Sequence, residues 1–114
     1  MRKAFSHLTL LCLIGCYSAP KIDGFDQQQW FNSWTECNDY RMLISDSIFK
    51  GSQSPLLTLS QNELQELLGK PDQHQLFNRN QKFFYYSLNC DKTYQLAVRF
   101  DALGRVKEVN IEKN

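Results

Sequence analysis

Hydrophobic positions recur at helical spacing through the middle of the chain and alternate with polar positions near its end. The clearest helix is predicted at 59–71, with a capping box, a hydrophobic staple, a leucine stripe, a left-handed glycine and a terminating proline. These features are carried by Leu59, Ser60, Glu63, Leu64, Leu67, Leu68, Gly69 and Pro71. We expect this helix to pack its leucines on the core.

Two earlier segments also have helical spacing. A helix is predicted at 40–50, because its apolar positions form one stripe and because Gly51 suits its end. The stripe consists of Tyr40, Leu43, Ile44 and Ile48, and Asn38 or Asp39 would cap it. In the segment 25–37, Trp30, Trp34 and Cys37 recur at helical spacing, and Asp26 would cap the start. The two tryptophans are either core residues, which is commoner in a small domain, or a binding platform.

After Pro71 the hydrophobic period changes to two, which is typical of half-buried strands. Strands are predicted at 83–88, 94–100 and 106–111, with a short edge strand at 73–77 and turns at 78–80 and 101–104. Helices followed by an antiparallel meander define an α+β domain. We therefore expect two or three N-terminal helices packed on one face of a three- to four-stranded antiparallel sheet.

Alternation also predicts which side chains share a face of the sheet. Tyr94, Leu96, Val98 and Phe100 would point to the helices. Phe83, Tyr85, Ala97 and Arg99 would then lie on the opposite face. Aromatic and arginine side chains on an open face are typical of protein interfaces, so these four are candidate partner-binding residues. The alternative is that the segment with Trp30 and Trp34 covers this face.

The first sixteen residues have the pattern of an export signal. Arg2 and Lys3 precede a short apolar run, and Leu13-Ile14-Gly15-Cys16 resembles a bacterial lipobox, in which the cysteine is acylated and the chain is cut before it. A plain signal peptide or a short membrane helix is the alternative, but the run is shorter than the roughly 20 residues that span a bilayer. We expect a signal peptide at 1–15, a lipidated tether at 16–24 and one domain at 25–114.

Removal of the signal leaves 99 residues with 11 basic and 12 acidic side chains, a net charge of −1. This balance gives no electrostatic reason to expect nucleic-acid binding. Pro20 and Gly24 suit an extended tether, which would lift the domain by about 25 Å from the membrane.

Two cysteines remain beside the acylated Cys16 in the processed chain. Cys37 and Cys90 would form a disulfide in an oxidising compartment, closing a loop of 53 residues. Two buried thiols or a metal site are the alternatives. The metal alternative has little support, because His74 is the only histidine after the signal and no C-x-x-C motif is present. We therefore expect neither a metal nor a cofactor.

Four parts of the sequence carry a resemblance to a known family. They are the helix Leu59-Ser60-x-x-Glu63-Leu64-x-x-Leu67-Leu68-Gly69-Lys70-Pro71-Asp72, the pair Tyr85-Tyr86, the strand Leu96-Ala97-Val98-Arg99-Phe100-Asp101 and the turn Gly104-Arg105-Val106. Together they resemble the SmpA/OmlA/BamE-type envelope lipoproteins. The resemblance covers roughly 57–111, and the lipobox belongs to the same pattern. It implies two helices on a three-stranded sheet, tethered to the inner leaflet of the outer membrane. Known members are accessory subunits of β-barrel assembly. The chain departs from the pattern at Thr58, where members often have glycine, and in the segment 25–37.

No constellation typical of an enzyme is present. His74 lies in a polar segment without a G-x-S-x-G element, and the five glycines are scattered rather than gathered in a phosphate-binding loop. We therefore do not expect an enzyme. Two classes remain, namely a membrane-anchored interaction module of the envelope facing the periplasm, and a free-standing inhibitor-like or ligand-binding lipoprotein of the same fold.

Overall fold

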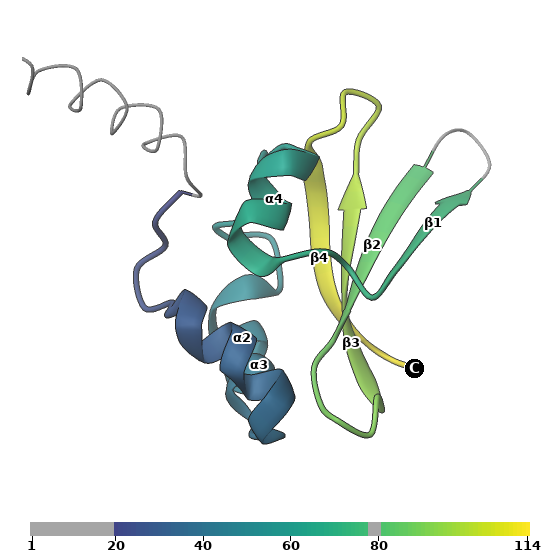
Figure 1. Ribbon diagram of the computed structural model, residues 1–114. Coiled ribbons are helices and arrows are strands. Elements are labelled where there is room, and N and C mark those ends of the chain that lie inside the picture. Colours follow the sequence, from purple (N-terminus) through teal and green to yellow (C-terminus); the bar gives the residue numbers. More distant parts are fainter. Residues whose placement is uncertain (1–19, 78–80) are drawn as a thin grey trace, which may run out of the picture.

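Helices come first and a four-stranded sheet follows in the computed structural model, which describes residues 20–77 and 81–114 (Figure 1). The elements are α2 (Gln27–Glu36), α3 (Tyr40–Ile44), the π-helix η1 (Ser45–Phe49), α4 (Gln61–Leu68), β1 (Gln73–Phe77), β2 (Gln81–Ser87), β3 (Tyr94–Phe100) and β4 (Val106–Lys113). The strands form an antiparallel meander in the order β1-β2-β3-β4. The predicted α+β architecture is confirmed.

The described helices all lie on one side of the sheet, which we call the inner face, and none of them lies on the other side, the outer face (Figure 1). The alternation of apolar and polar residues predicted that Leu96, Val98 and Phe100 point to the helices. These three side chains are buried on the inner face. The fully buried side chains between the two layers include Trp30, Phe49, Leu56, Leu64, Leu68, Tyr86, Leu88, Leu96, Val98 and Val109. Burial of this apolar surface is the main force that holds the layers together.

The predicted capping of α4 is confirmed at its start. The Ser60 hydroxyl accepts a hydrogen bond from the Glu63 amide at 3.1 Å, and the Glu63 carboxylate accepts one from the Ser60 amide at 2.9 Å. The end of the helix differs from the expectation, because Gly69 has φ 86° and ψ −176°, outside the left-handed helical region. A Cβ at Gly69 would also lie 3.0 Å from the Phe31 ring, so glycine is required there by both conformation and space.

The helix predicted at 40–50 is not one continuous α-helix. It is α-helical only to Ile44 and then widens into η1, where the Lys50 amide donates to the Ser45 carbonyl at 3.0 Å. The wider π-turn moves the buried stripe from Ile48, which is only partly buried, to Phe49, which is fully buried. Leu43, expected in the stripe, is 65% exposed.

The structure of α2 shows whether its tryptophans are core residues or a binding platform, which the sequence left open. Asp26 caps it by accepting a bond from the Gln29 amide at 3.2 Å, as expected. Trp30 is fully buried and donates its indole N–H to the Leu68 carbonyl at 3.0 Å. Its ring lies edge-on to Phe49 at 5.8 Å between centroids. Trp30 is therefore a core residue that joins α2 to α4.

The predicted disulfide between Cys37 and Cys90 is confirmed, with a Cα–Cα distance of 5.5 Å. Cys37 is the C-terminal cap of α2 and has φ 52°, a left-handed conformation. Cys90 follows β2, in the loop that leads to β3. The bond therefore ties the end of the first helix to the sheet.

The ordered domain begins before Phe25, where the sequence placed its start. Ile22, assigned to the tether, packs against the core, and its carbonyl accepts a bond from the Phe25 amide at 3.1 Å. A Cβ at Gly24, whose φ is 82°, would meet the Ile48 side chain at 3.0 Å. Of the predicted 16–24 tether, therefore, at least the part from Ile22 onward belongs to the domain.

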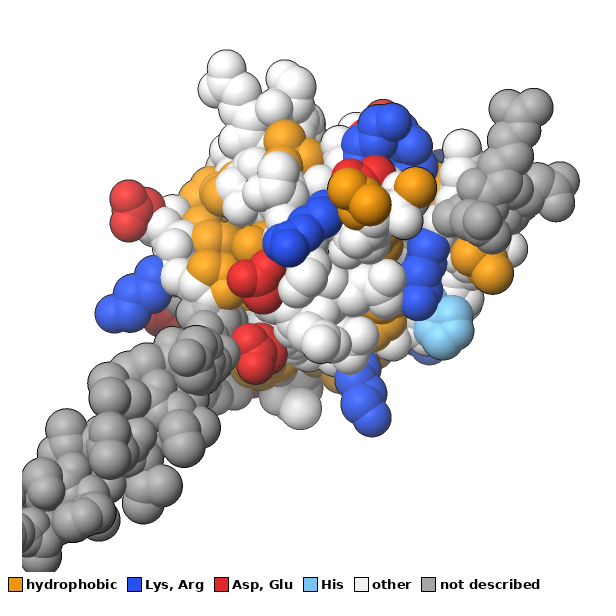
Figure 2. Space-filling model, turned by 90° about the horizontal axis from the view of Figure 1, so that it is seen from above, with side chains coloured by type: hydrophobic (Ala, Val, Ile, Leu, Met, Phe, Trp, Pro, Cys, Tyr) orange, Lys and Arg blue, Asp and Glu red, His pale blue; other side chains and the backbone are white. Residues whose placement is uncertain are grey.

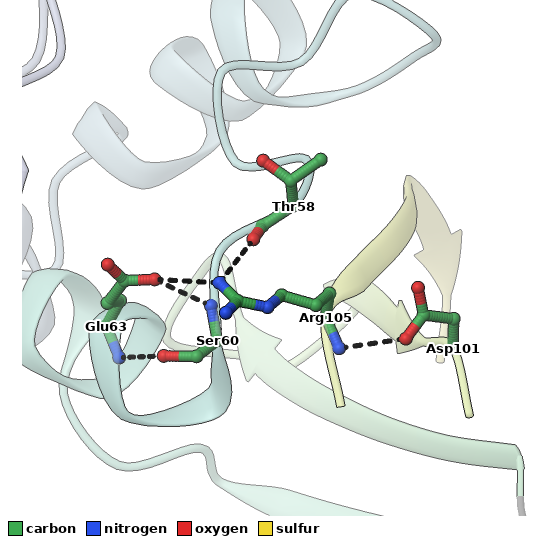
Figure 3. A network of polar contacts seen from close by, with 5 residues as sticks. All are labelled: Thr58, Ser60, Glu63, Asp101 and Arg105. Carbon is green, nitrogen blue, oxygen red and sulfur yellow. Dashed lines mark hydrogen bonds and ion pairs between the residues drawn. The ribbon is translucent and has the colours of Figure 1, made fainter. Parts of the chain in front are cut away.

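Arg105 joins the capping box to the turn between β3 and β4 (Figure 3). Its guanidinium donates to the Thr58 carbonyl at 3.2 Å and lies 3.8 Å from the Glu63 carboxylate. Asp101 accepts bonds from the amides of Leu103 and Arg105 at 2.9 and 3.0 Å, which lowers the pKa of its carboxyl group. The predicted turn at 101–104 is thus built by one aspartate. The predicted turn at 78–80 lies outside the described residues.

Candidate interaction surface

The four predicted partner-binding residues lie together on the outer face. The sheet register places Phe83 opposite Arg99 and Tyr85 opposite Ala97, so they form a block of neighbouring positions on the two central strands. The rings of Phe83 and Tyr85 are stacked, with centroids 5.8 Å apart and planes inclined by 6°. The block therefore consists of an aromatic pair on β2 beside a small residue and an arginine on β3.

Arg99 is held in place by an ion pair across the outer face. Its Nε lies 2.9 Å from the carboxylate of Glu108 on β4, and the two side chains are 23% and 49% exposed. Hydrogen bonds from Arg99 and Asn110 lower the pKa of Glu108, which stays ionised at neutral pH. This pair presents a fixed positive and negative group at one side of the aromatic pair.

The accessible part of the block is smaller than alternation predicted. Tyr85 is only 8% exposed and Ala97 only 3% exposed, whereas Phe83 and Arg99 are half-buried. Tyr85 lies on an interior strand, stacked on Phe83 and flanked by Gln73 and Ala97, so its neighbours cover most of the ring. Burial, followed by the charge of Glu112, raises the pKa of its phenol. Phe83 and Arg99 are therefore the side chains that a partner would reach.

Polar side chains surround this aromatic and basic centre. By register, the neighbouring outer-face positions are Gln73 and Gln75 on β1, Gln95 on β3, and Glu108 and Asn110 on β4. An apolar centre with a polar rim is the usual composition of a protein-binding patch. Within the part of the chain that the structure describes, the segment with Trp30 and Trp34 lies on the inner side and does not cover this face.

Arg41 is a buried residue that no sequence pattern singled out. It is 8% exposed, donates from Nε to the Trp30 carbonyl at 2.9 Å, and donates from a terminal nitrogen to the Ser87 carbonyl at 3.2 Å. Its guanidinium lies 4.5 Å from the Trp30 ring centre and 5.5 Å from that of Trp34. Burial lowers its pKa, and the charge of Asp72 acts in the opposite direction. Arg41 ties α2, α3 and β2 together. Because its guanidinium lies over the Trp34 ring, it also covers part of that half-buried side chain.

Two shallow grooves lie on the helical side of the domain. One, of 710 Å³, is formed by residues 20–25 together with Gln27, Glu66 and Leu67. The other, of 650 Å³, lies between the end of α4 and β1, and its lining includes Gln65, Lys70, His74 and Phe84. Within the described residues no group of three His, Cys, Asp or Glu side chains could hold a metal ion.

Charges of both signs are interspersed on the end of the domain seen in Figure 2, where Lys and Arg side chains stand beside Asp and Glu side chains. This view shows no continuous basic surface of the kind that follows a nucleic-acid backbone.

Comparison with known proteins finds no matching family model, no matching curated protein and no matching solved structure. In the described part of the chain, no helix combines the length and the apolar character needed to cross a membrane.

Proposed function

We propose that this chain is a lipid-anchored envelope protein whose domain binds another protein through the outer face of its sheet. The observation that carries the proposal is the stacked pair of Phe83 and Tyr85 beside the Arg99–Glu108 ion pair, on a face that the described helices leave open. Aromatic and arginine side chains dominate the binding energy of protein interfaces. Their polar rim keeps such a face soluble before the partner binds.

Cys16 and its lipobox lie outside the described residues, so the support for the lipid anchor comes from the sequence alone. Pro20, where the described chain begins, is four positions after Cys16, and four steps of about 3.5 Å each span at most about 14 Å. The domain would therefore stay close to the membrane, and its partner would be a membrane protein or a protein held at the membrane.

The resemblance to SmpA/OmlA/BamE-type lipoproteins supports a more specific proposal. On this basis we propose that the domain faces the periplasm, anchored to the inner leaflet of the outer membrane, as an accessory subunit of β-barrel assembly. A free-standing inhibitor-like or ligand-binding lipoprotein is the second candidate, and the two grooves of 710 and 650 Å³ favour it.

Partner capture from detergent-solubilised outer membrane tests the proposal. The wild-type lipoprotein should retain a stoichiometric membrane-protein partner. Phe83→Ala and Arg99→Ala should each weaken capture by more than about 1 kcal/mol, roughly fivefold in affinity. Leu43→Ser is the matched control, because Leu43 is 65% exposed on α3, in the helical layer. Equal capture by all three variants would contradict the outer-face proposal, and a lone protein that inhibits a periplasmic enzyme would support the second candidate.

Intact-mass analysis tests the anchor separately. The mature protein should begin at Cys16 and carry acyl mass, and Cys16→Ser should abolish both the modification and membrane retention. An unmodified N-terminus elsewhere would contradict this part of the proposal.

A further inference from the structure

The two edges of the sheet differ in how they are protected. On the β4 edge, the Val109 carbonyl accepts a bond from the Gly51 amide at 2.9 Å. Nearer the start of β4, Val106 bonds through both its carbonyl and its amide, with the Thr58 amide at 2.8 Å and the Leu59 carbonyl at 2.8 Å. Charged side chains on β4 add to this protection, because charges on an edge strand discourage pairing with another chain.

Among the described residues, nothing protects the β1 edge in these ways. Strand β1 pairs only with β2, and within residues 20–77 and 81–114 no other backbone segment bonds to its second edge. Its sequence Gln-His-Gln-Leu-Phe contains no lysine, arginine, aspartate, glutamate or proline. Residues 73–76 are exposed, and Leu76 has 68% of its surface in solvent. An exposed edge without lysine, arginine or carboxylate side chains is a ready template for another strand.

We propose that β1 is a self-association edge, at which two copies of this chain pair their β1 strands antiparallel about a twofold axis at Gln75. The two four-stranded sheets then form one continuous eight-stranded sheet. In this register His74 of one copy lies opposite Leu76 of the other, Gln73 lies opposite Phe77, and Gln75 lies opposite itself. A twofold interface must be self-complementary, and this strand satisfies the condition because no like charges face each other.

The open groove beside β1 leaves room for the second copy on the helical side. The 650 Å³ groove lies between β1 and the end of α4, and His74 and Gln75 belong to its lining. A second β1 strand would cover the exposed Leu76 with the neighbouring His74. The outer faces of both copies would become one surface, so a partner bound at Phe83 and Arg99 would meet two equivalent sites.

The expected size of the interface decides where pairing occurs. A five-residue strand covers less than the roughly 800 Å² per partner that a stable interface needs, so pairing is weak between freely diffusing copies. Anchoring at Cys16 confines the copies to one surface and raises their effective concentration. This step rests on the proposed lipid anchor, and the dimer is therefore expected on the membrane.

Site-specific cross-linking in native membranes tests the pairing. Gln75→Cys should give an intermolecular disulfide, because directly opposed residues in antiparallel strands have Cα atoms about 5 Å apart. Gln73→Cys is the matched control on the same strand, since its two copies would be about 13 Å apart, beyond disulfide reach. Peptide mapping must identify the 75–75 link apart from the native Cys37–Cys90 bond. Equal cross-linking at 73 and 75, or none at 75, would overturn the proposal.

A charge at the twofold axis gives a second readout that needs no new cysteine. Gln75→Lys places two like charges opposite each other and should reduce the dimer captured by a lysine-independent chemical cross-linker roughly fivefold. Leu43→Lys adds the same charge on α3 and should leave the dimer unchanged. Vesicle flotation shows separately whether the anchor is present. Partner capture with intact flotation but no cross-link at 75 would reject only the pairing, whereas loss of flotation would reject the anchor.

Discussion

The guanidinium carbon of Arg41 lies 4.5 Å from the centre of the Trp30 ring. A positive charge over an indole face is attracted by the ring electrons, and the attraction is stronger when water is excluded, as it is at this buried site. The same guanidinium donates to the carbonyls of Trp30 and Ser87, which belong to α2 and β2. One side chain of α3 therefore joins the first helix to the sheet.

Replacement of Arg41 should destabilise the domain, because its buried side chain joins two elements. Arg41→Lys keeps the charge but loses the planar fork that reaches both carbonyls, so we expect a loss of about 1–2 kcal/mol in urea unfolding. Arg41→Ala should cost about 2–4 kcal/mol, because it also leaves a cavity beside Trp30. Lys50→Ala, at an exposed lysine paired with Asp46, is the control and should change stability by less than about 0.5 kcal/mol. Wild-type stability of Arg41→Lys would contradict this role.

Replacement of Ser45 should stabilise the domain, in contrast to replacement of Arg41. It is fully buried at the start of η1, and its hydroxyl is the one buried side-chain polar group in the described residues without a hydrogen-bond partner. Ser45→Ala removes the desolvated hydroxyl and should stabilise the domain by about 1 kcal/mol.

Ser33→Ala is the matched control for Ser45. Ser33 is also buried, but its hydroxyl donates to the Asn38 carbonyl at 3.1 Å, so its removal should destabilise by about 1 kcal/mol. Thermal unfolding of both variants measures the difference. Destabilisation by both substitutions would show that the Ser45 hydroxyl is satisfied in solution.

Part of the fold follows from sequence because its causes are local. The capping box and the strand 94–100 depend on residues a few positions apart, and the sequence contains all of them. The pairing of Cys37 with Cys90 followed from the number of cysteines, because these two are expected to remain beside an acylated Cys16 once the signal is removed. The grouping of Phe83, Tyr85, Ala97 and Arg99 followed from the alternation of side chains along antiparallel strands.

The features that were missed depend on neighbours far apart in the chain. Tyr85 and Ala97 are covered by side chains of adjacent strands, so alternation gives their face but not their exposure. The π-turn at η1 goes together with the full burial of Phe49 and the partial burial of Ile48, a packing arrangement that the helical stripe does not reveal. Arg41 is buried because two carbonyls and two indoles from other elements surround it, and no local pattern encodes that arrangement.

The capping box gives a pH-dependent prediction. A hydrogen bond from the Ser60 amide is the main cause that lowers the pKa of Glu63 below its ordinary 4.5. A lowered pKa means that Glu63 contributes stability above its unfolded-state pKa and loses it as the pH falls through the folded value. The side chain is 46% exposed, so solvent screening limits the effect to a few tenths of a kcal/mol.

Glu63→Gln keeps the capping hydrogen bond but removes the charge. Wild type should therefore be slightly more stable than this variant in urea at pH 7, and the two should converge at pH 3. Ser60→Ala, which removes the cap itself, should cost about 1 kcal/mol at both pH values. A Glu63→Gln difference that grows toward pH 3 would show that the sign of the effect is wrong.

The last prediction separates two effects at Cys37. The double variant Cys37→Ser with Cys90→Ser removes the cross-link and should lower the free energy of unfolding by about 2–4 kcal/mol, the usual effect of losing a native disulfide. Serine at 37 must still adopt φ 52°, which costs a residue with a Cβ roughly 1 kcal/mol relative to glycine. Cys37→Gly with Cys90→Ser should therefore recover about 1 kcal/mol, as measured by urea unfolding of both variants beside wild type. If glycine and serine at 37 give equal stability, the left-handed cap of α2 is not maintained without the disulfide, and the cross-link then determines the end of the helix.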